Sequence, residues 1–340
     1  VIFSGKDGRL YRKSLDKGFP QPITPEFGSV AAPQLSPSND WVIFVHTYEG
    51  RDVLALVDPE GRNWPIKLAE GADFYMQPIW HPSGKAFAWV EWNHPNMPWD
   101  GTRLMYAVLE DTPPKIQAAQ HLAGGVDIPI LQPAFSPNGR YLSYVQNKGE
   151  WDQLILRDLD EGTSKVLVEG ASLLKPAWIQ GVVVQAWAPD SERIYFVQSD
   201  AGMNQLNRVQ VGSGDIETLD LSPYTSLGQP AVSPEDRLAL LANAPTISSR
   251  VISLKEKNVV VHQRSTSEII PAEDLPSPYE ITWKTSEGDT VYGIYSPPTS
   301  SRYQGQGLPP AIVQVHGGPT SSASIGYDPH AAFYTSRGYG

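Results

Sequence analysis

One unit of sequence recurs five times and constrains the fold of this chain more than any other feature. Each copy has a short apolar segment, then Ser-Pro or a close variant, a polar turn, and a strand pattern rich in aromatic residues. The prolines of the five turns are Pro37, Pro82, Pro137, Pro189 and Pro234, separated by 45, 55, 52 and 45 residues. A repeat of about 40 to 50 residues is typical of the blades of a β-propeller.

The chemistry of the unit is that of a β-hairpin. Proline presets φ at the first corner of the turn, and Asn, Asp or Gly suits the corner that follows. Two further strand patterns follow in most copies, as at 153–158 and 164–168. A four-stranded blade cannot bury its faces alone, so blades stack around an axis. An all-β sandwich with chance Ser-Pro turns is the alternative.

The opening residues fit the same scheme. Segments 1–4, 10–15 and 22–24 resemble the last three strands of an earlier blade. We therefore expect a mainly-β protein whose residues 1–268 form a β-propeller with five full blades and a partial one. Because closed propellers have four to eight complete blades, we expect this propeller to be incomplete at its N-terminus.

An insertion in the second copy, residues 89–101, is too apolar for an idle surface connection. It holds three Trp, two Pro and a His. We single out Trp92, Asn93, His94 and Trp99 as a loop that lines a substrate chamber or a domain interface. A loop that packs on its own blade is an equal alternative. His94 has no Asp, Glu or His around it at metal-binding spacing, and we expect no metal and no cofactor.

The pattern changes after Ser265. Residues 269–278 are a proline-rich linker, and 279–284 with 290–295 form a predicted hairpin. We expect residues 279–340 to be the start of an α/β domain.

A glycine turn near the end of the chain carries the clearest chemical signal. Residues 311–315 are an apolar run of the length expected for a buried strand, and His316-Gly317-Gly318-Pro319 breaks it. Pro319 has no N–H, so the free donors of the turn belong to Gly317 and Gly318. Fixed main-chain donors are what an oxyanion hole needs, and α/β-hydrolases have such a turn after a strand. A purely structural Gly-Gly turn is the alternative.

A helix is predicted to follow the turn, with Asp328 as N-cap and Pro329 at its first position. It extends from His330 to Arg337 and ends at Gly338. An oxyanion turn requires this order of elements: first a strand, then the glycine turn, then a loop and a helix.

If the chain belongs to a hydrolase, it carries the oxyanion donors without a recognisable nucleophile. No Gly-x-Ser-x-Gly nucleophile elbow is present, and Ser321, Ser322 and Ser324 have no strand-to-helix elbow around them. We expect the nucleophile, acid and base to lie beyond Gly340, and the 340-residue chain alone to be inactive.

Composition excludes several classes of function. The net charge is −11 with no basic run, which disfavours nucleic-acid binding. The absence of cysteine excludes thiol catalysis and disulfides. No stretch approaches the roughly 18 apolar residues of a membrane span, so we expect no membrane. Because the first residue is Val1, we expect the natural N-terminus to be absent. We expect a cytoplasmic location, and assembly into a homo-oligomer is left open.

The order of Ser-Pro blades, hairpin and His-Gly-Gly-Pro resembles the prolyl oligopeptidase family of serine peptidases. Within the family it is most similar to the dipeptidyl-aminopeptidase and acylaminoacyl-peptidase branch. The residues that carry the resemblance are 92–102, 315–320 and 334–339. The likeness extends over the whole chain but matches only the middle of the family's usual length.

The resemblance implies a function for the intact protein. It would cleave short peptides by Ser-His-Asp acyl transfer, as an aminopeptidase or an acylaminoacyl-peptidase. Gly318, with Gly317 beside it, matches the glycine whose amide binds the oxyanion, and the propeller matches the family's filter against folded proteins. A propeller that serves as a binding scaffold without catalysis, and an esterase of the same fold, are the alternatives.

Overall fold

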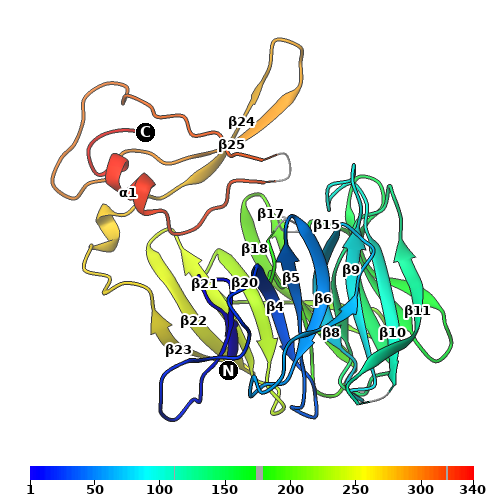
Figure 1. Ribbon diagram of the computed structural model, residues 1–340. Coiled ribbons are helices and arrows are strands. Elements are labelled where there is room, and N and C mark those ends of the chain that lie inside the picture. Colours follow the sequence, from blue (N-terminus) through cyan, green and yellow to red (C-terminus); the bar gives the residue numbers. More distant parts are fainter. Residues whose placement is uncertain (111, 174–178, 319–320) are drawn as a thin grey trace. The chain divides into compact units, whose positions relative to one another are not determined.

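The computed structural model describes residues 1–110, 112–173, 179–318 and 321–340 (Figure 1). The chain divides into two compact units, Val1–Val182 and Val183–Gly340. Each unit is built mainly from antiparallel β-sheets whose strands follow one another in sequence order.

The first unit holds four sheets. A three-stranded sheet comes first, formed by β1 (Ile2–Ser4), β2 (Leu10–Arg12) and β3 (Gln21–Pro22). The next has β4 (Ser29–Leu35), β5 (Val42–Tyr48), β6 (Arg51–Val57) and β7 (Ile66–Ala69). The third has β8 (Phe74–Trp80), β9 (Ala86–Trp92), β10 (Arg103–Glu110) and β11 (Lys115–Gly124). The fourth has β12 (Ile130–Phe135), β13 (Tyr141–Asn147), β14 (Asp152–Asp158) and β15 (Ser164–Ala171).

The second unit holds two more four-stranded sheets and a C-terminal region. The sheets are β16 (Gln185–Trp187), β17 (Arg193–Asp200), β18 (Met203–Gln210) and β19 (Ile216–Leu219), then β20 (Ser226–Val232), β21 (Leu238–Ala244), β22 (Ile247–Lys255) and β23 (Asn258–Arg264). The C-terminal region has a 3-10 turn η1 (Ala272–Asp274), a hairpin of β24 (Tyr279–Lys284) and β25 (Thr290–Tyr295), and helix α1 (Pro329–Thr335). Among the described residues, no helix is long and apolar enough to cross a bilayer.

The six sheets that precede η1 are the blades of a six-bladed β-propeller, numbered here in chain order. We expected five full blades and a partial one. The structure gives five blades of four strands, and the first blade has three. The hairpin of β24 and β25 has the bounds predicted from sequence.

The five turns, three with Ser-Pro and two with His-Pro or Ala-Pro, share one geometry, which explains the repeat. In the second blade the N–H of Asn39 donates to the carbonyl of Ser36 at 2.9 Å, and the N–H of Ser36 donates to the carbonyl of Trp41 at 2.7 Å. The residue two places after each proline has a φ between 58° and 78°, the region that Gly, Asn and Asp tolerate best. These residues are Asn39, Gly84, Gly139, Ser191 and Asp236.

A second repeated feature lies in the first strand of the blades. In four of them the residue before a proline has a positive φ, and the pairing with the next strand shifts at that point. Such a shift is a β-bulge, which bends the strand and redirects a side chain. The four residues are Ala32, Gln77, Gln132 and Gln229.

The hydrophobic core lies between consecutive blades. Ile43 and Leu56 of the second blade pack with Phe87 and Trp89 of the third, and all four side chains are almost fully buried. Equivalent clusters join the first blade to the second, the third to the fourth, and the fifth to the sixth. Burying one such side chain contributes about 1.5–3 kcal/mol, so blade stacking is the main stabilising term within each unit.

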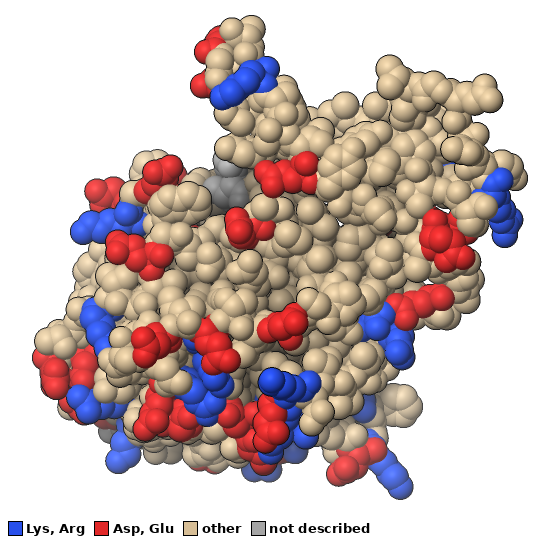
Figure 2. All heavy atoms as spheres, turned by 180° about the vertical axis from the view of Figure 1, so that it is seen from behind, with Lys and Arg blue, Asp and Glu red and all other residues tan. Residues whose placement is uncertain are grey.

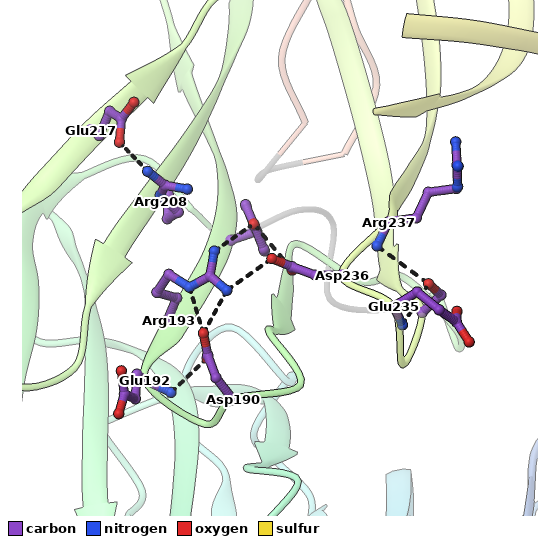
Figure 3. A network of polar contacts seen from close by, with 10 residues as sticks. Asp190, Glu192, Arg193, Arg208, Glu217, Glu235, Asp236 and Arg237 are labelled. Carbon is purple, nitrogen blue, oxygen red and sulfur yellow. Dashed lines mark hydrogen bonds and ion pairs between the residues drawn. The ribbon is translucent and has the colours of Figure 1, made fainter. Parts of the chain in front are cut away.

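A polar network joins the turns of the fifth and sixth blades (Figure 3). The Arg193 guanidinium donates to Asp190 in its own turn at 2.7 Å and to Asp236 in the next turn at 2.8 Å. Asp236 is the residue with positive φ in that turn. On the face drawn in Figure 2, acidic and basic side chains are interspersed, in keeping with many such local pairs.

One sequence prediction was wrong. Residues 311–315 do not form a buried strand, and the side chains of Val313 and Val315 are more than four-fifths exposed. The physical reason is that a central strand needs neighbouring strands on both edges. The described residues supply only Gly340, whose N–H donates to the carbonyl of Pro310 and whose carbonyl accepts from the N–H of Ile312, both at 2.8 Å.

Candidate functional site

The glycine turn presents two free main-chain donors. Gly317 and Gly318 are exposed, and within the described residues neither N–H has a hydrogen-bond partner. Gly318 has a φ of +73°, which a residue with a Cβ rarely adopts. A Cβ placed on Gly317 would meet no atom of the described residues within 4 Å. Pro319 and Thr320, the rest of the predicted turn, lie outside the described residues.

The segment after the turn leads into α1. The side chain of Asp328 accepts hydrogen bonds from the N–H of His330 at 2.8 Å and of Ala331 at 3.2 Å, so it is the N-cap that the sequence predicts. Pro329 occupies the first helical position. The helix ends at Thr335, two residues before the predicted end, and Gly338 follows with a positive φ.

The insertion in the third blade packs against its own blade. Trp92 is the last residue of β9, is 8% exposed and stacks on Phe74 with ring centres 5.1 Å apart. The N–H of Asp73 donates to the side chain of Asn93 at 2.8 Å, and the N–H of His94 donates to the side chain of Asp73 at 2.9 Å. These contacts hold the start of the insertion on its own blade, and a role at a chamber or interface stays a prediction.

The second half of the insertion approaches the segment before β12. The side chain of Asn96 donates to the carbonyl of Val126 at 2.6 Å. A Cβ on Gly101 would lie 2.3 Å from the carbonyl oxygen of Gly125, so only glycine fits there. Trp99 is partly buried. Whether His94 and Trp99 face a chamber stays a prediction.

A pocket of about 450 Å³ lies in the second unit. It is lined by loops of the fifth and sixth blades, by residues 276–280 of the linker and hairpin, and by Ile325. Pro223, Pro245, Pro276 and Pro278 make it largely apolar, and Glu280 adds one carboxylate. Its volume is within the usual range of about 300–1,000 Å³ for small-molecule sites. Within the part of the chain that the structure describes, no group of three His, Asp or Glu is placed to hold a metal ion.

Sequence reasoning missed the residues that hold the loop beyond the glycine turn. Thr225 and Asn243, both in the sixth blade region, hydrogen-bond to Ile325 and Tyr327. The contacts span 100 and 84 residues, and no local pattern in the sequence signals them.

Among the solved structures to which this chain is similar are those of peptidases. A puromycin-hydrolyzing peptidase of Mycobacterium tuberculosis has 26% sequence identity and a TM-score of 0.89, over 99% of this chain and 55% of that one. A puromycin hydrolase has 27% identity and a TM-score of 0.89, with the same two coverages.

A more distant match shows the fold alone. It comes from a study of two prolyl endopeptidases and has 12% identity and a TM-score of 0.59, over 97% of this chain and 56% of the other. No protein-family model and no curated protein sequence matches this chain. The chain spans about half the length of these three solved structures.

Proposed function

The chain carries the β-propeller of the prolyl oligopeptidase family of serine peptidases, and on this premise we propose that the protein containing it cleaves short peptides. The observation that carries the proposal is the match over 99% of the chain to a peptidase described as puromycin-hydrolyzing. Because the chain spans 55% of that structure, the proposed activity is that of a longer protein.

We propose that residues 279–340 begin an α/β-hydrolase domain, joined to the propeller, residues 1–268, by the linker 269–278. The two hydrogen bonds between Gly340 and the carbonyl and amide that flank Ala311 have the pattern of a parallel strand pair. Helix α1 lies between the two paired segments in sequence, as the crossover of a β-α-β unit does. This arrangement is what an α/β domain requires at its start.

In the proposed reaction a serine hydroxyl attacks the carbonyl carbon of a peptide bond, and a histidine accepts the proton of that hydroxyl. The carbonyl oxygen then becomes an oxyanion. The N–H of Gly318, with that of Gly317 beside it, would donate to this oxygen in the transition state. We propose that the serine, histidine and aspartate lie outside these 340 residues, and that the chain supplies the donors and the propeller that limits which substrates enter.

The propeller would admit short peptides and exclude folded proteins. Aminopeptidase and acylaminoacyl-peptidase action both fit this arrangement, and we propose peptide amides as the substrate class. The residues 92–99 of the insertion would border the chamber with the exposed side chains of Asn93 and His94.

The experiment uses the protein that contains this chain and a set of chromogenic aminoacyl and N-acyl-peptide amides. Gly318→Ala is expected to lower kcat by about 10- to 1,000-fold, because a residue with a Cβ disfavours the φ of +73° and the donor is displaced. Gly307→Ala is the matched control, since Gly307 also has a positive φ, in the connection before the turn, with no atom within 4 Å of an added Cβ.

Three outcomes would contradict the proposal. An unchanged kcat in Gly318→Ala removes the role of this glycine. A wild-type protein that hydrolyses neither set of amides removes the peptidase function and favours a propeller that serves as a binding scaffold. Hydrolysis of the corresponding esters without the amides would indicate an esterase of the same fold.

A further inference from the structure

Three hydrogen bonds hold the loop between the glycine turn and α1 onto the fifth and sixth blades. The N–H of Ile325 donates to the carbonyl of Gly202 at 2.7 Å. The hydroxyl of Thr225 donates to the carbonyl of Ile325 at 2.6 Å. The N–H of Tyr327 donates to the side-chain oxygen of Asn243 at 2.8 Å. We call this set of contacts the loop clamp.

The clamp is closely packed as well as hydrogen-bonded. Ile325 is 8% exposed. A Cβ on Gly326 would lie 2.6 Å from the side-chain oxygen of Asn243, and a Cβ on Gly202 would lie 3.0 Å from Ile294 and 3.5 Å from Ile325. Two glycines, one on the blade and one on the loop, therefore allow the two segments to approach this closely.

The blade side of the clamp is part of a fixed network. The N–H of Thr225 donates to the carbonyl of Asn243 at 3.0 Å, and the carbonyl of Thr225 accepts from the N–H of Asn204 at 2.8 Å. The side chain of Asn204 in turn accepts from the N–H of Leu227 at 3.1 Å. Thr225 and Asn243 are thus held by main-chain bonds within the sixth blade region and, through Asn204, to the fifth blade before they bind the loop.

The glycine turn lies between two attachment points. On one side Ile312 is hydrogen-bonded to Gly340, and on the other Ile325 to Tyr327 are held by the clamp. The second point is also where Asp328 caps α1. A segment fixed at both ends samples fewer conformations than one fixed at a single end, so the clamp limits where Gly317 and Gly318 can lie.

We infer that Thr225 and Asn243 are positioning residues that orient the glycine turn for acyl transfer through the loop clamp. The inference rests on the proposed function for its catalytic part, while the clamp itself can be measured without any activity. Neither side chain is proposed to touch substrate; each acts through the main chain of the loop.

The test combines amide hydrogen exchange with kinetics in the protein that contains this chain. Asn243→Ala removes the acceptor of the Tyr327 N–H, and exchange of that amide is expected to rise by about 2- to 10-fold, the effect of one lost hydrogen bond. The same variant is expected to lower kcat by about 10- to 100-fold with KM unchanged, because the donors are misplaced and no substrate contact is lost.

Three further variants keep the test specific. Asn243→Asp retains an acceptor oxygen and is expected to restore both exchange protection and kcat. Thr225→Val removes one donor at nearly constant volume and serves if Asn243→Ala does not fold. Asn207→Ala is the matched control, since Asn207 is 3% exposed in β18 and accepts from the hydroxyl of Thr218, within the same blade.

The outcomes separate this inference from the proposed function. Unchanged exchange of Tyr327 in Asn243→Ala, or an equal rise in Asn207→Ala, overturns the clamp. Increased exchange with an unaltered kcat in an active protein overturns the positioning role. A wild-type protein without peptidase activity contradicts the proposed function, and the exchange result then still decides whether the clamp exists.

Discussion

The side-chain oxygen of Gln77 accepts a 2.6 Å hydrogen bond from the main-chain N–H of Gln132, the residue at the same position of the next blade. Both residues are at the β-bulge of the first strand. At this bulge the side chain of Gln77 reaches beyond its own blade. Its amide nitrogen also donates to the carbonyl of Val182 at 3.3 Å. A side chain of one repeat thus binds the main chain of the next.

Replacing this side chain is expected to destabilise the propeller. Gln77→Met keeps the length of the side chain but removes the acceptor, and the N–H of Gln132, a residue only 5% exposed, loses that partner. The expected loss is about 1–3 kcal/mol of unfolding free energy, measured by urea denaturation. Gln120→Met in the exposed part of β11 is the control, with an expected change below about 0.5 kcal/mol. Equal effects of the two variants would contradict this role.

A methyl group on Gly326 is expected to open the loop clamp from the other side. In Gly326→Ala the added Cβ would lie 2.6 Å from the side-chain oxygen of Asn243, which must move and release the N–H of Tyr327. Exchange of the Tyr327 amide should rise as in Asn243→Ala, and the double variant should add little, since both changes break one bond. Gly305→Ala, at a glycine with open space around it, should leave the exchange unaltered. Additive effects in the double variant would show that the two changes act separately.

The ion pairs of Arg193 are expected to stabilise the second unit modestly and in a salt-dependent way. Arg193→Met removes the contacts to Asp190 and Asp236, at side chains that are 20–33% exposed. A loss of about 1 kcal/mol is expected at low salt, because surface ion pairs are partly screened by water. Arg51→Met, at an exposed position in β6, is the control. The difference between the two variants should shrink at about 1 M NaCl, where the Debye length is roughly 3 Å, and an effect independent of salt would argue against ion pairing.

The carboxyl group of Asp7 is expected to titrate well below its ordinary range. The hydroxyl of Tyr11 donates to it at 2.6 Å and the Arg9 guanidinium at 2.8 Å, and together they lower the pKa of Asp7 from 3.8 to about 2. Because the folded-state pKa is the lower one, the stabilisation is complete above pH 3.8 and is lost as the pH falls through about 2.

The variant Tyr11→Phe removes the larger of these contributions and should raise the pKa of Asp7 toward 3.8. Carboxyl-carbon NMR titration of the two proteins measures the shift directly. Tyr48→Phe, in the second blade, is the control and should leave the titration of Asp7 unaltered. A midpoint of Asp7 that is the same in all three proteins would contradict the role of the Tyr11 hydroxyl.

Local turn chemistry made the propeller predictable from the sequence. Pro37 and its four equivalents fix one corner, and a residue that tolerates positive φ follows each of them two places later. Such a turn depends on four or five adjacent residues, so the pattern is visible without knowledge of the partner strands. The hairpin of β24 and β25 was predictable for the same reason.

The rest depends on contacts between distant residues. Residues 311–315 have the composition of a buried strand, but pairing needs neighbours that composition cannot supply. The contact of Asn243 with Tyr327 leaves no periodic signal. The bulge residues do have a signal in the sequence, because the dipeptide Gln-Pro recurs as Gln77-Pro78, Gln132-Pro133 and Gln229-Pro230. The roles of Gly317 and Gly318 stay a prediction, because free N–H groups in a turn do not by themselves identify a reaction.

The loop clamp has a mechanical consequence. Its three bonds end on two different blades, with Gly202 on the fifth and Asn243 on the sixth. Any displacement of these two blades that opens the space between them must lengthen or break at least one bond to the segment 325–327. A change in the spacing of these two sheets would therefore be transmitted, through the segment 325–327, to the part of the chain that carries Gly317 and Gly318.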